Sequence, residues 1–86
     1  MMTPPEIEAL IRGAMPDAVV LLEDLTGGQD HWSAVVVSAA FEGQPPIKRH
    51  RAVYKALGAA VGGPIHALQL ETLTPQQARL KGMLAD

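Results

Sequence analysis

FEGQPPIKRHRAVYKALG (residues 41–58), followed closely by IHALQLETLTP (residues 65–75), decides the fold of this chain. The first stretch opens with a Gly- and Pro-containing turn and then repeats apolar and aromatic residues at helical spacing from Ile47 to about Val61. Gly62-Gly63-Pro64 supplies the helix stop. The second stretch alternates apolar and polar residues up to Leu73, so we expect a strand from Ile65 to Leu73.

The residues before this pair of stretches predict a helix and a hairpin. Thr3-Pro4-Pro5-Glu6 has the pattern of a capping box, and the helix that starts there should end at Pro16. Two short apolar runs, residues 18–22 and 32–38, flank a segment that contains two glycines and predict paired strands. After the last strand, Thr74 repeats the cap pattern and predicts a closing helix of about ten residues.

The predicted order is helix, strand, strand, helix, strand, helix. Nearly all crossover connections are right-handed, so the second and third strands should run parallel and the sheet should be mixed. We therefore expect an α+β fold: a two-layer α/β sandwich with a three-stranded mixed sheet and helices on one face, in a single domain over residues 1–86.

Composition limits the classes of function. Hydrophobic residues make up 48% of the 86 residues, which indicates a globular chain. The longest nearly apolar run, residues 34–41, is too short to span a membrane, so we expect no membrane partner and, by elimination, a cytoplasmic location. The chain has no cysteine and offers no thiolate as nucleophile, redox couple or metal ligand. Any iron-sulfur chemistry would need sulfur from elsewhere.

Basic residues are concentrated in the central predicted helix. The net charge is −2, yet four of the seven basic residues lie within eight positions: Lys48, Arg49, Arg51 and Lys55. A solvated face is the commonest origin of such spacing. A surface that contacts nucleic-acid phosphates or an acidic partner is the functional alternative.

No catalytic motif stands out, so we do not expect an enzyme. Thr26-Gly27-Gly28 lacks the Gly-Lys ending of a phosphate loop, and no nucleophile elbow or zinc-protease helix is present. His66, at a strand start, is either satisfied by the backbone or a ligand; His31, at the end of the hairpin loop, is either solvated or a ligand. Two histidines alone do not make a zinc site, which normally has three or four protein ligands.

The motifs Phe41-Glu42-Gly43, Arg49-His50-Arg51-Ala52-Val53-Tyr54 and Ile65-His66-Ala67 together resemble the signature of the BolA family. The resemblance implies a fold like that of class II KH domains. It also implies a non-enzymatic adaptor that binds a monothiol glutaredoxin and shares a [2Fe-2S] cluster with it, in cluster assembly and trafficking or iron homeostasis. His66 matches the histidine such proteins use as a ligand, and the hairpin loop would supply the second, as His31 or, more weakly, Asp30.

Two other functions stay open. Family members are described as transcription regulators, which implies DNA binding through Lys48, Arg49, Arg51 and Lys55. The negative net charge and the absence of a Gly-x-x-Gly loop weigh against this alternative. The third alternative is a structural interaction module in which the histidines are incidental. The sequence leaves the oligomeric state open, including a homodimer.

Overall fold

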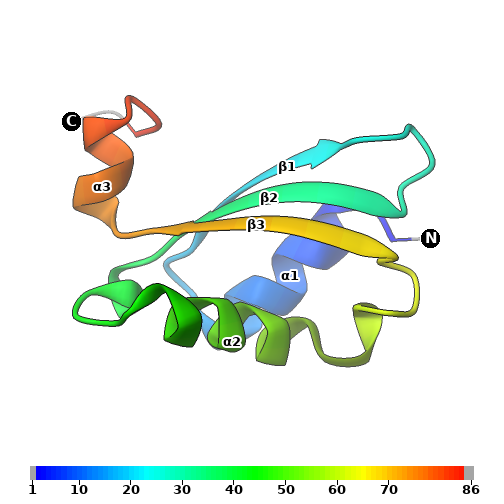
Figure 1. Cartoon of the computed structure of the whole chain (residues 1–86), viewed down its shortest axis with the longest axis horizontal. Coiled ribbons are helices and arrows are strands. Elements are labelled where there is room, and N and C mark those ends of the chain that lie inside the picture. The colour runs from blue at the N-terminus through cyan, green and yellow to red at the C-terminus, as the bar shows by residue number, and fades with distance from the viewer. Residues whose placement is uncertain (1, 85–86) are drawn as a thin grey trace.

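The computed structural model describes residues 2–84 and confirms the predicted order of elements (Figure 1). The elements are α1 (Pro4–Ala14), β1 (Val19–Asp24), β2 (His31–Val37), α2 (Pro46–Leu57), β3 (Ala67–Leu73) and α3 (Pro75–Leu80). Two short 3-10 helices, η1 (Ala39–Phe41) and η2 (Gly58–Ala60), precede and follow α2 and were not predicted. No helix within residues 2–84 is both long and apolar enough to cross a bilayer.

The three strands form the predicted mixed sheet, with β2 in the centre. β1 runs antiparallel to β2, with Val19 opposite Val37. β3 runs parallel to β2, with His31 opposite Ala67. The observed β3 begins two residues later than the expected strand, so His66 lies just before the strand.

The main core lies between the sheet and the helix pair α1 and α2, which cover one face together (Figure 1). Trp32 and Val36 of β2 point into this core and are nearly inaccessible to solvent. They meet Ile7 and Ile11 of α1 and Val53 and Leu57 of α2. Each large aliphatic side chain buried in this way contributes about 1.5–3 kcal/mol relative to exposure.

α3 lies on the opposite face of the sheet from α1 and α2. Successive strand residues point to opposite faces, so Val37 points away from the core that Val36 enters. Val37, Leu73 and Ala78 of α3 form a second, smaller cluster. The predicted fold class is confirmed. The expectation of helices on one face of the sheet holds for α1 and α2. α3 instead covers one end of the other face, because the chain leaves β3 beside Val37 and Leu73.

Local sequence signals set the helix boundaries. At α1, the Thr3 amide donates to Glu6 Oε1 at 3.0 Å; at α3, the Gln77 amide donates to Thr74 Oγ1 at 3.2 Å. α3 is six residues long instead of the predicted ten. Gly82 follows with a φ of 72°, a left-handed conformation that ends the helix.

Candidate metal centre and basic helix

The structure brings the two predicted ligands, His31 and His66, together at one end of the sheet. Their ring centroids are 6.1 Å apart and the ring planes are inclined by 29°. His31 is the first residue of β2 and lies opposite Ala67, the residue after His66. The parallel pairing of β2 and β3 therefore juxtaposes residues from two distant parts of the chain.

Asp30 contacts both histidines. Its main-chain carbonyl accepts hydrogen bonds from the His66 amide at 2.7 Å and the Ala67 amide at 3.3 Å. Its side-chain Oδ1 lies 3.0 Å from His31 Nδ1, which is an ion-pair distance without the geometry of a hydrogen bond. The same Oδ1 accepts a hydrogen bond from the Thr26 hydroxyl at 2.9 Å. His31 and then Thr26 lower the pKa of the Asp30 carboxyl, which favours its charged form beside the imidazole.

The loop that carries Asp30 is organised by Asp24. The Asp24 carboxylate accepts hydrogen bonds from the amides of Thr26, Gly27 and Gln29 at 3.3, 3.0 and 3.0 Å. This role of Asp24 was not predicted from the sequence. An Asp two residues before a Thr-Gly-Gly turn was the available signal, because Asp side chains often accept hydrogen bonds from backbone amides two or more residues ahead.

His66 is fixed from the other side by the turn that follows η2. The Ile65 amide donates to the Ala60 carbonyl at 2.9 Å, and the Gly62 amide donates to the Ile65 carbonyl at 2.8 Å. The Ile65 side chain is completely buried, whereas His66 is exposed and the His31 side chain is 42% exposed. Both imidazoles are thus held by a fixed backbone and remain accessible from outside.

The separation of the two imidazoles is close to that of two ligands on one metal ion. Two imidazoles on one tetrahedral ion, with bonds of about 2.0 Å, have centroids about 5 Å apart. The observed 6.1 Å is within about 1 Å of that separation. Within residues 2–84, no group of three or more His, Cys, Asp or Glu side chains is arranged to hold a metal ion. The pair could therefore supply part of a ligand set.

The predicted basic residues of α2 lie in two different environments. Lys48, Arg51 and Lys55 are exposed. Arg49 instead donates from Nε to the Gln44 carbonyl at 2.8 Å and from Nη1 to Gln77 Oε1 at 2.9 Å, and its guanidinium lies 6.0 Å from the centre of the Phe41 ring. These contacts tie α2 to η1 and α3, a structural role that the sequence did not reveal.

Comparison with known proteins identifies the group to which this architecture belongs. The family model described as BolA-like protein matches residues 13–77. The chain belongs to the BolA family. Human BolA-like protein 1 is 38% identical over 89 residues, which cover 91% of this chain and 65% of the human protein. The chain therefore spans slightly less than two thirds of that relative.

Other BolA relatives extend the comparison. The structure of a BolA protein homologue from Coxiella burnetii has a TM-score of 0.77 and 38% identity, covering 92% of this chain and 99% of that one. The Haemophilus influenzae protein named DNA-binding transcriptional regulator BolA is 35% identical over 51 residues, 59% of this chain and 50% of that protein. The predicted resemblance and fold are confirmed, while the roles of His31, His66 and the basic residues stay predictions.

Proposed function

We propose that this BolA-like chain is a non-enzymatic adaptor that binds a monothiol glutaredoxin and shares a [2Fe-2S] cluster with it. The adaptor would act in cluster assembly and trafficking or in iron homeostasis. One observation carries the proposal: two solvent-accessible imidazoles, His31 and His66, come together at one end of the sheet with centroids 6.1 Å apart.

The ligand chemistry is consistent with a cluster whose ligands come from two proteins. Two imidazoles can replace two thiolates on one iron of a two-iron cluster, as in Rieske centres. The chain has no cysteine, so glutaredoxin and its bound glutathione would supply the thiolates. When bound, the cluster supplies the electron-accepting and iron-donating chemistry, and this chain contributes binding and orientation.

Asp30 would act as a positioning residue. A carboxylate beside one nitrogen of a ligating histidine fixes the ring and increases its basicity. With Asp30 at 3.0 Å from Nδ1 of His31, the Nε2 atom of that ring is the one available for a ligand bond. The His66 amide bond to the Asp30 carbonyl sets the position of the second imidazole relative to the first.

Anaerobic reconstitution tests the proposal. The chain, a monothiol glutaredoxin, glutathione, iron and sulfide are combined, and visible circular dichroism is recorded for the wild type, His66→Ala and His31→Ala. We expect a heterocomplex spectrum that differs from glutaredoxin alone, is lost in His66→Ala and is altered in His31→Ala. His50→Gln, on α2, is the matched control and should keep the wild-type spectrum.

If the wild-type chain leaves the glutaredoxin spectrum unchanged, shared ligation is wrong for that partner. A heterocomplex spectrum that survives in both His31→Ala and His66→Ala would show that the complex forms without these imidazoles as ligands.

Binding of duplex DNA is the second candidate. The exposed side chains of Lys48, Arg51 and Lys55 favour it, as does the similarity to the Haemophilus influenzae protein named DNA-binding transcriptional regulator BolA. Contacts from these three cations to phosphates predict a salt dependence of log affinity with a slope of about −3, and Arg51→Gln should reduce it by about 1. A slope near zero would show that the basic residues do not contact phosphates and form a solvated face of α2.

A further inference from the structure

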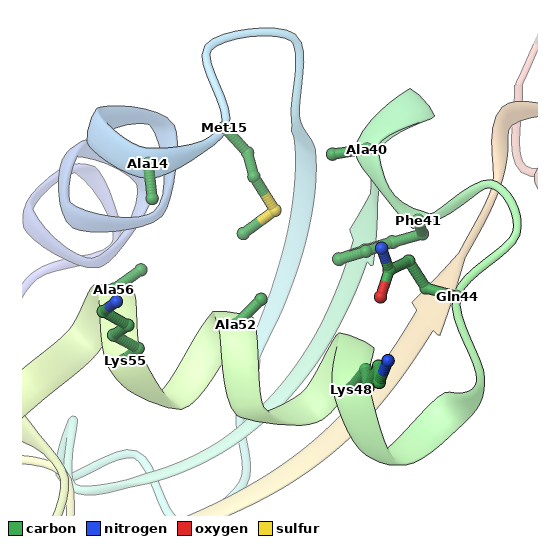
Figure 2. A pocket seen from close by; sticks show the side chains of 9 residues that line it. All are labelled: Ala14, Met15, Ala40, Phe41, Gln44, Lys48, Ala52, Lys55 and Ala56. Carbon is green, nitrogen blue, oxygen red and sulfur yellow. The ribbon is translucent and has the colours of Figure 1, made fainter.

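A concave groove lies where the C-terminal end of α1 and the short helix η1 approach α2. It has a volume of about 490 Å³. Met15 and Phe41 point into it, and both are almost wholly buried (Figure 2). The groove shares no residue with the His31 and His66 pair, so it is a separate surface.

Small side chains line the walls of the groove, and the charged residues at its rim are basic. Alanines from α1, η1 and α2 line the walls, including Ala52, and Gln44, Lys48 and Lys55 are the polar residues that line it. Lys48 and Lys55 are exposed, and among residues 2–84 neither forms an ion pair. They lie two turns apart on α2, a rise of about 10.5 Å, with Ala52 between them.

We propose that this groove binds an amphipathic helix of an acidic partner protein. The partner helix would lie along α2 and place an apolar side chain over Met15, Phe41 and Ala52. Two carboxylates about two helical turns apart would pair with Lys48 and Lys55. This is helix-in-groove recognition, in which an apolar anchor supplies affinity and flanking charges set the register.

The chemistry of the groove favours a protein helix over duplex DNA. A phosphate backbone would use the lysines but leave the apolar lining without a partner, whereas an apolar side chain would cover the exposed alanines Ala14, Ala40 and Ala52. The groove also falls within the usual 300–1,000 Å³ range of ligand pockets and is lined mostly by apolar residues. Its single sign of charge selects acidic over basic helices.

The test is a titration of the ¹⁵N-labelled full chain, without iron, followed by amide chemical shifts. The probe is a stapled helical peptide with a leucine midway between two glutamates that lie two turns apart. The control peptide carries lysines in place of the glutamates. We expect saturable shifts at the amides of Ala14, Ala40 and Ala52 with the acidic peptide, and at least fivefold weaker binding of the basic one.

Variants of the chain locate the contacts. Replacing both rim lysines, as Lys48→Gln with Lys55→Gln, should weaken the acidic peptide by about fivefold, because each exposed ion pair contributes about 0.2–1 kcal/mol. Ala52→Leu adds a side chain at an exposed position that lines the groove and should weaken binding by steric exclusion. Arg51→Gln removes a charge from the same helix outside the groove and should leave the affinity unchanged.

Three results would overturn the inference: no shifts at millimolar acidic peptide, equal binding of the acidic and basic peptides, or shifts confined to another surface. A DNA duplex that shifts the groove amides when the peptide does not would reassign the surface to nucleic acid. Because iron and glutaredoxin are left out, the titration is independent of the proposed cluster function.

Discussion

The main-chain carbonyl of Asp30 accepts a hydrogen bond from the amide of His66 at 2.7 Å. The carboxylate of the same residue lies 3.0 Å from His31. One residue therefore positions both predicted ligands, through its backbone on one side and its side chain on the other. Substitution of Asp30 removes only the side-chain contact, so the two effects can be separated by experiment.

Asp30→Ala should weaken the shared cluster without unfolding the chain. Loss of a carboxylate that orients a ligating histidine typically costs 10–100-fold in metal affinity, and we expect about tenfold here. The measurement is the rate at which a chelator removes iron from the reconstituted heterocomplex, with Trp32 fluorescence in urea as the test of folding. Glu42→Ala, at an exposed position away from the histidines, is the control. Equal rates for wild type and Asp30→Ala would exclude the positioning role.

Gly62→Ala should destabilise the turn that leads to His66. Gly62 has a φ of 90°, a conformation that costs about 1–2 kcal/mol for a residue with a Cβ. Open space around the position leaves strain as the only cost. Gly13→Ala is the matched substitution, because Gly13 lies in α1 with equally open surroundings. Urea unfolding should show Gly62→Ala less stable by about 1 kcal/mol and Gly13→Ala more stable by about 0.5 kcal/mol. An equal effect of the two substitutions would rule out backbone strain at Gly62.

Asp17 should make stability depend on pH in the acid range. Its carboxylate accepts the Ala39 amide at 2.8 Å and the Ser38 hydroxyl at 2.7 Å, and these bonds, the Ala39 amide first, lower the pKa of Asp17. A carboxyl with a lowered pKa in the folded state stabilises the fold above its unfolded pKa of about 3.9, and this stability is lost as the pH falls through the folded pKa.

The comparison of wild type with Asp17→Asn isolates this effect. Wild type should be more stable by about 1 kcal/mol at pH 7, below the usual value for two charge-assisted hydrogen bonds because solvent screens the exposed carboxylate, and the difference should shrink as the pH falls below about 4. Urea unfolding at a series of pH values measures it, with Glu42→Gln as the exposed control. A difference that does not change between pH 7 and pH 2 would show that the charge of Asp17 is not what stabilises η1.

The parts of the fold that depend on residues adjacent in the sequence were predictable, and the parts that depend on tertiary contacts were not. Thr3 and Thr74 mark helix starts because capping is decided within three residues, and the handedness of crossovers predicted that the second and third strands run parallel. The same pairing explains why two histidines distant in sequence meet. The Asp30 contacts and the position of α3 depend on which segments meet across the sheet, and no single-sequence pattern encodes that.

Arg49 shows the same limit and gives the last prediction. Sequence grouped it with Lys48, Arg51 and Lys55, but its guanidinium joins the Gln44 carbonyl to Gln77 of α3. Arg49→Ala should therefore cost about 1–2 kcal/mol in the free energy of unfolding, whereas Arg51→Ala, at an exposed position, should change it by less than about 0.5 kcal/mol. Arg49→Lys should recover only part of the loss, because an ammonium group lacks the planar fork that reaches two acceptors at once. Urea unfolding followed by Trp32 fluorescence measures the stability of both variants. Equal stability of Arg49→Ala and Arg51→Ala would show that Arg49 is part of the solvated basic face. A loss of stability confined to Arg49→Ala would show that Arg49 links α2 to α3.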